Sequence, residues 1–177
     1  MRTVSRLPAA LLALALLAAT GGATASTRTV DDADDTVGKL DVRTATAGHA
    51  GDLVAHTLTM HERWASKALQ AGTATMIFRI GKRTRTMNID FRHGALFAEI
   101  CTEAADSSFS DCSKNVGLSR PDRKSIRITL KKRLLEKGLT SYRWTASTYL
   151  NQGESGCTEL SCLDSVPDDS SGIRHRL

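Results

Sequence analysis

The sequence predicts an all-β fold, an antiparallel β-sandwich of about eight strands with one or two short helical turns. In residues 124–130, apolar side chains from Ile126 to Leu130 alternate with polar ones, and residues 139–150 alternate in the same way around Trp144. A period of two places each apolar set on one face of a strand. Several other segments of the chain alternate with the same period, and short turn-forming segments separate them. This arrangement is typical of sandwiches of the jelly-roll or immunoglobulin-like type.

The remaining strands follow from the same alternation, taken in chain order. We expect a first strand beginning at Leu40 and further strands over 52–62, 76–80, 87–91, 95–101 and 113–119. The three strands within 76–101 should form an antiparallel meander, because the loops between them contain only a few residues. The predicted helical turns lie in the crossover at 63–72 and in the segment 131–138, which ends near Gly138.

The N-terminus carries the features of a secretory signal peptide over residues 1–25. Arg2 and Arg6 precede an apolar run from Leu7 to Ala19, and Ala23 and Ala25 provide the small-x-small cleavage pattern. The run is too short to span a bilayer, so we expect a secreted, extracellular protein without a transmembrane segment. Residues 26–37 are predicted to be an acidic flexible lead-in, and residues 38–177 a single domain with a polar C-terminal tail that either adds a short edge strand or stays loose.

The four cysteines are expected to form disulfide bonds, since an exported chain meets an oxidising environment. Three pairings are open, and we favour Cys101–Cys112 and Cys157–Cys162 because each pair is close in sequence and encloses a polar loop. The alternative is a zinc site that uses the four thiolates and His175. The cysteine spacings do not match a zinc knuckle.

Several short strings resemble those of a group of uncharacterised, secreted actinobacterial β-sandwich proteins. The strings are LDVRTAT at 40–46, RPDR and IRITL within 120–130, YRWTAST at 142–148, and the C-x4-C-x-D-x2-P-D run at 157–168 that leads to H-x-L. The acidic lead followed by Leu-Asp-Val also resembles the first strand of sugar- and haem-binding sandwich modules of the DOMON and CBM9-like kind. The first group has no established activity, so the resemblance implies the fold and no site.

Motifs of common enzymes are absent from the sequence, so we do not expect an enzyme. His56 lies among apolar residues and is interpreted as a core histidine. A secreted hydrolase is a remaining alternative, because pairs of carboxylates can hydrolyse glycosides. Its candidate carboxylates are Glu62, Asp90, Glu99 and Asp122.

Basic residues surround two predicted hairpins and suggest a function in binding. The chain has a formal net charge of +5, two units of which belong to the predicted signal peptide. The candidate ligand-binding residues are Arg79, Lys82, Arg83, Arg85, Arg123, Lys124 and Arg127. If the solvent faces of the hairpins are neighbours, they form one basic stripe that attracts anionic polymers. Charge that merely protects sheet edges from aggregation is the alternative.

We therefore expect a non-catalytic binding or surface-interaction protein, a monomer whose partner is an anionic cell-envelope polymer. Nucleic acid is not expected, because aromatic residues do not alternate with the basic ones.

The second functional hypothesis is a calcium-supported carbohydrate-binding module. Trp64 and Tyr149 are its candidate stacking residues, although aromatic residues make up only 5% of the chain. Calcium prefers carboxylate oxygens, but the acidic segments do not have the spacing of an EF-hand loop. The candidate calcium ligands are Asp31, Asp34, Asp164 and Asp168.

Overall fold

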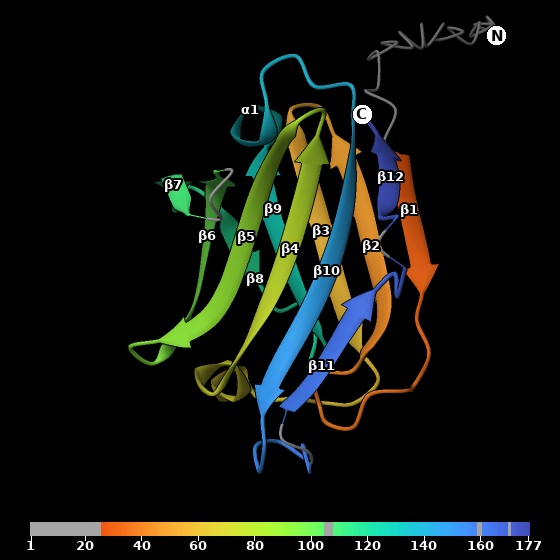
Figure 1. Ribbon diagram of the computed structural model, residues 1–177, viewed down its shortest axis with the longest axis vertical. Helices are drawn as coiled ribbons and strands as arrows, with labels where there is room; N and C mark the ends of the chain where they lie inside the picture. Colours follow the sequence, from red (N-terminus) through yellow and green to blue (C-terminus); the bar gives the residue numbers. More distant parts are fainter. Residues whose placement is uncertain (1–25, 105–107, 159–160, 170) are drawn as a thin grey trace, which may run out of the picture.

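The protein is a sandwich of two antiparallel β-sheets (Figure 1), seen in a computed structural model that describes residues 26–104, 108–158, 161–169 and 171–177. The predicted all-β sandwich is confirmed, and the predicted signal peptide lies outside the described residues. The described residues form twelve strands where about eight were expected. No helix within the described ranges is long and apolar enough to cross a membrane.

Five strands form the first sheet and seven form the second. The five-stranded sheet has the order β1 (Ser26–Asp31), β2 (Val42–Ala50), β3 (Leu53–Met60), β9 (Ser125–Lys131) and β8 (Gly117–Ser119). The seven-stranded sheet has the order β11 (Ser161–Val166), β10 (Ser141–Asn151), β4 (Gly72–Ile80), β5 (Arg83–Arg92), β6 (Ala95–Glu103) and β7 (Phe109–Ser113). Its seventh strand, β12 (Ile173–Arg176), pairs with the first half of β10, on the edge that β11 uses in the second half.

The order of the strands is that of an immunoglobulin-like sandwich. The chain crosses from β3 in one sheet to β4 in the other, and crosses again from β9 to β10. β3 pairs with β9, and β4 pairs with β10. The sequences β2-β3-β9-β8 and β11-β10-β4-β5-β6 therefore reproduce the A-B-E-D and G-F-C-C′-C″ orders of the variable type. Of the two sandwich types considered from the sequence, this pairing is the immunoglobulin-like one.

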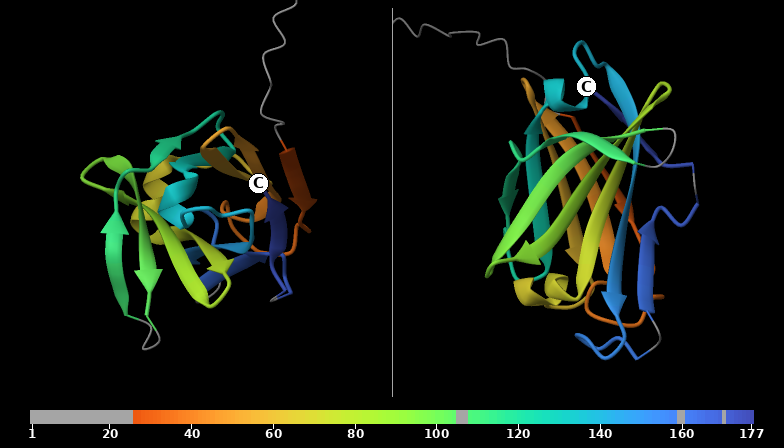
Figure 2. Two further views of the ribbon diagram at one scale, coloured as in Figure 1. Left: turned by 90° about the horizontal axis from the view of Figure 1, so that it is seen from above. Right: turned by 60° about the vertical axis from the view of Figure 1, so that its left-hand side comes forward.

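The two sheets pack face to face (Figure 2), and the buried core residues lie between them, in the predicted alternation. Ile126, Ile128 and Leu130 of β9 point inward, and so do Tyr142 and Trp144 of β10. The strand β9 ends in a short helix, α1 (Lys132–Leu135), whose Leu135 is buried. A 3₁₀ turn, η1 (Ser66–Gln70), closes the opposite end of the sandwich at the predicted crossover.

A histidine and three aromatic rings occupy the centre of the core. His56 of β3 is fully buried, and its Nε2 lies 2.8 Å from the hydroxyl oxygen of Tyr142 on the facing sheet. Phe78 and Trp144 each form a T-shaped, edge-to-face contact with the same imidazole ring. In antibody domains a disulfide joins these two core strands. Here a hydrogen bond between β3 and β10 joins the sheets, so His56 is a core residue.

Both expected disulfides are formed, Cys101–Cys112 between β6 and β7, and Cys157–Cys162 between the turn after β10 and the strand β11. The alternative of a zinc site is therefore not supported, because sulfur in a disulfide is not a thiolate ligand. Two disulfides are typical of a protein that folds in an oxidising environment.

Three parts of the chain form more strands than the sequence predicted. The lead-in, expected to be flexible, begins with β1, which pairs along its whole length with β2. The segment expected to be one strand at 113–119 is divided between β7 and β8, which belong to different sheets. The polar tail contributes both β11 and β12. These strands lie at sheet edges. β1, β7 and β8 bury little apolar surface, whereas Val166 of β11 and Ile173 of β12 are buried in the core.

Candidate functional site

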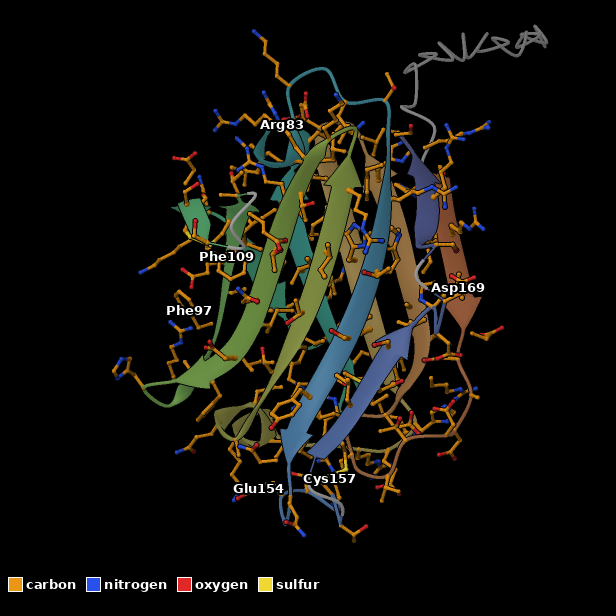
Figure 3. The ribbon with its side chains drawn as sticks, in the orientation of Figure 1. Arg83, Phe97, Phe109, Glu154, Cys157 and Asp169 are labelled. Carbon is orange, nitrogen blue, oxygen red and sulfur yellow. A yellow bond between two sulfur atoms is a disulfide. The ribbon has the colours of Figure 1, made fainter. Side chains whose placement is uncertain are left out.

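Basic residues collect at one end of the sandwich. This end contains the β4–β5 turn, the connection from β9 through α1 to β10, and the C-terminus (Figure 1). Arg83 lies there beside α1 (Figure 3), and its Nη1 is 3.9 Å from the carboxylate of Glu136. Exposed Lys82 and Arg133 belong to the same end. We call this region the basic end.

Three arginines lie side by side on the outer face of the seven-stranded sheet near the basic end. The backbone of Arg143 in β10 is paired directly with Arg79 of β4 on one side and with Arg174 of β12 on the other. Their neighbours along each strand are buried, so all three side chains face solvent. Adjacent strands are only about 4.8 Å apart, and like charges directly opposite each other repel. We call these residues the arginine row.

The arginine row continues into a cleft between β1 and β12. The cleft has a volume of about 390 Å³, and its lining includes Arg28, Arg174 and Arg176. One guanidinium nitrogen of Arg28 donates a hydrogen bond to the backbone oxygen of Arg174 at 3.2 Å. Arg143 donates to the backbone oxygens of Ser171 and Gly172 at 2.7 and 3.1 Å. These bonds hold guanidinium groups along one edge of the sheet.

The expected single basic stripe along the two hairpins is not formed. Arg79 belongs to the seven-stranded sheet and Arg127 to the five-stranded sheet, so their outward faces point away from each other. Arg123 and Lys124 lie at the opposite end, in the β8–β9 turn, where the Lys124 ammonium donates to the backbone oxygen of His61 at 2.6 Å. Arg85 is half-buried and donates to the hydroxyl of Thr102. Only Arg79, Lys82 and Arg83 of the predicted set share the basic end.

Trp64 does not provide the exposed stacking surface that was expected. Its side chain is only 5% exposed, and its indole nitrogen donates to the backbone oxygen of Lys124 at 2.8 Å. The Arg120 guanidinium covers the ring at 3.9 Å from the centroid and donates to the backbone oxygens of Trp64 and Arg123 at 2.8 and 2.7 Å. Trp64 and Arg120 thus hold the β8–β9 turn against the chain that follows β3.

Tyr149 lies on the solvent face of β10, as expected, and is 37% exposed. Its hydroxyl lies 2.7 Å from the side-chain oxygen of Asn151, and its strand neighbour is exposed Leu163. Phe109 is the other exposed large aromatic residue among the described residues, and it lies with Phe97 on the far flank of the sheet (Figure 3). A stacking platform of adjacent aromatic rings is therefore not present in the described part of the chain.

Two of the four predicted calcium ligands, Asp164 and Asp168, lie in one carboxylate cluster together with Asp32, Asp35 and Asp41. Oxygen atoms of Asp32, Asp164 and Asp168 lie within 4.8 Å of one another, and so do those of Asp35, Asp41 and Asp164. We call these five residues the aspartate cluster. Asp31 is exposed in β1, and Asp34 lies 4.0 Å from His61; neither belongs to these two groups.

Burial and mutual repulsion perturb the aspartate cluster. Burial, together with the negative charges of Asp164, Asp168 and Asp35, raises the pKa of Asp32 to about 6. Burial also raises the pKa of Asp41, assisted by Asp34 and Asp164. Burial raises the pKa of Asp164 despite the hydrogen bonds that it accepts. Carboxylates with raised pKa values are typical of sites that bind protons or cations.

Three of the four hydrolase candidates are held by local interactions. Asp122 accepts hydrogen bonds from the backbone nitrogens of Lys124 and Ser125, both at 2.7 Å, and these bonds lower its pKa. Asp90 accepts a hydrogen bond from Nε of Arg92 at 2.8 Å. Glu99 lies 3.9 Å from the same guanidinium group. Glu62 is exposed beyond the end of β3.

The fold and these surfaces define a class, an immunoglobulin-like sandwich with two disulfides, a basic end and an aspartate cluster. Comparison with protein families, with curated proteins and with solved structures finds no match to this chain. The functional argument therefore rests on the side chains themselves.

Proposed function

We propose that this chain is a secreted, non-catalytic binding protein that attaches to anionic polymers of a cell envelope through its basic end. The arginine row is the observation that carries the proposal. The three arginines place like charges on adjacent strands of one face, and phosphate or carboxylate groups bound across them would offset the repulsion between such charges. Arginine presents a planar fork of donors that suits these anions.

The position of the arginine row also suits a long ligand. The row runs across three adjacent strands, β4, β10 and β12, and the β1–β12 cleft continues it past the edge of the sheet. A polymer with repeated charges can follow such a path, whereas a small anion would contact only one or two of the arginines. Lys82 and Arg83 in the nearby turn extend the positive field towards α1.

The test is retention on immobilised heparin and on immobilised teichoic acid, with and without the double substitution Arg79→Gln/Arg174→Gln. Arg143 is kept because its side chain holds the segment before β12. We expect the substitution to weaken binding at least about tenfold, since hydrogen bonds to charged groups contribute about 1.5 kcal/mol or more each. High salt should abolish retention of the unsubstituted protein.

The matched control is Arg123→Gln/Arg127→Gln, which removes the same charge from exposed positions outside the basic end. This control should keep its retention on both resins. Equal weakening by the two double substitutions would mean that net charge alone is responsible, and absence of retention on either resin would contradict the proposed function.

A further inference from the structure

We infer that the aspartate cluster is a calcium site, formed between the segment that joins β1 to β2 and the strand β11 with the turn that follows it. Asp32, Asp35 and Asp41 come from the first segment, and Asp164 and Asp168 come from the second. Asp164 belongs to both groups of three and is the central ligand. This site lies away from the basic end, and its argument does not depend on the proposed polymer binding.

Asp41 is the observation that points to a bound cation. Its side chain is only 2% exposed, and neither carboxylate oxygen has a hydrogen-bond partner. One carboxylate oxygen of Asp32 is also buried without a partner. Burying an unpaired carboxylate is costly, so buried charges are normally paired or coordinated to a metal. None of the ion pairs among the described residues involves a member of the aspartate cluster.

The geometry and the chemistry of the ligands favour calcium. Two oxygens bound to one calcium ion at about 2.3–2.6 Å can be at most about 5 Å apart. Each group of three meets this condition, because its ligand atoms lie within 4.8 Å of one another. Zinc prefers nitrogen and sulfur ligands. Magnesium requires near-octahedral geometry and keeps several waters, whereas calcium accepts many carboxylates in flexible arrangements.

The backbone around the cluster is held in place without the ion. Asp164 accepts hydrogen bonds from the backbone nitrogens of Val42 and Ser165, both at 2.6 Å. The hydroxyl of Thr148 donates to the backbone oxygen of Leu40 at 2.6 Å. The buried carboxylate of Asp41 therefore has a fixed position, while exposed Asp35 and Asp168 leave the cluster open to solvent. A bound ion would fasten the β1–β2 segment to β11.

Thermal unfolding and titration calorimetry test the inference on the mature chain. After treatment with EDTA, about 2 mM calcium should raise the Tm by at least about 5 °C, because a ligand that binds only the folded state stabilises it. The same concentration of magnesium should have less than half of this effect. Calorimetry should give a Kd of about 1 mM or tighter, the range of extracellular calcium modules.

The substitution Asp41→Asn separates a metal ligand from a structural residue. It should abolish most of the calcium shift and should leave the Tm in EDTA unchanged or higher, because it removes a repelling charge without changing the side-chain shape. The control Asp31→Asn removes a charge from the neighbouring strand, outside the cluster, and should keep the full shift. A shift that is absent from the unsubstituted protein, that survives Asp41→Asn, or that magnesium reproduces fully would overturn the assignment.

Discussion

Replacing Trp144 by alanine is expected to lower the free energy of unfolding by about 3–5 kcal/mol, the usual cost of deleting a large core side chain. Trp144 is fully buried in β10, and its ring centroid lies 4.4 Å from that of His56 on the facing sheet. The substitution leaves a cavity between the two sheets, so both lose contacts. Urea unfolding followed by circular dichroism measures the loss.

The matched control is Tyr149→Ala, in the same strand but on its solvent face. Tyr149 is 37% exposed and bonds only to Asn151 on the surface, so we expect a cost below about 1 kcal/mol. A second variant, Trp144→Phe, should lower the free energy of unfolding less than Trp144→Ala. The indole nitrogen has no hydrogen-bond partner, so its removal leaves no polar group unpaired. Similar losses for Trp144→Ala and Tyr149→Ala would contradict the assigned faces of β10.

Acidification from pH 6.5 to pH 4.5 is expected to lower the free energy of unfolding of the protein by about 2–3 kcal/mol more than that of the variant His56→Gln. Burial, with a smaller contribution from the neighbouring His175, lowers the pKa of His56 to about 3. In the unfolded chain the imidazole takes up a proton below about pH 6.5, whereas in the folded chain it stays neutral. The stability contributed by the neutral histidine is therefore lost as the pH falls from about 6.5 towards 3.

The test compares unfolding free energies of the two proteins across this pH range. Contributions of the other titrating groups, including His175 and the aspartate cluster, are common to both proteins and cancel in the difference. The control Tyr142→Phe removes the partner of His56 Nε2 but keeps the imidazole, so it should lower stability at every pH and preserve the slope. Parallel pH profiles for the unsubstituted protein and His56→Gln would show that His56 does not remain neutral in the folded state.

The inward and outward faces of the long strands were predictable from residue order alone. In β9 and β10 the alternation of apolar and polar residues is strict, and a one-residue error would exchange the two faces. The disulfides were also predictable, because each cysteine pair is close in sequence and short loops close readily. Both features depend on neighbours along the chain.

The edge strands were not predictable in this way. In β1 only Val30 is a sizeable apolar residue, so the segment carries no burial pattern. It is a strand because β2 offers it a row of backbone partners, and β12 is paired with β10 in the same manner. Such pairing depends on what lies beside the segment in space, which local residue order does not encode.

The two proposed sites also combine features that the sequence suggested with features that only the tertiary structure shows. Residue types and charge already suggested an anion-binding surface and a calcium site as hypotheses, with Arg79, Asp164 and Asp168 among the candidates. Only strand register brings Arg143 and Arg174 to Arg79, and only the packing of the β1–β2 segment against β11 buries Asp41 beside Asp164. Residue order determined which side chains turn inward, because the pleat has a period of two. The tertiary structure decided which charges meet, because those contacts join strands that are far apart in the chain.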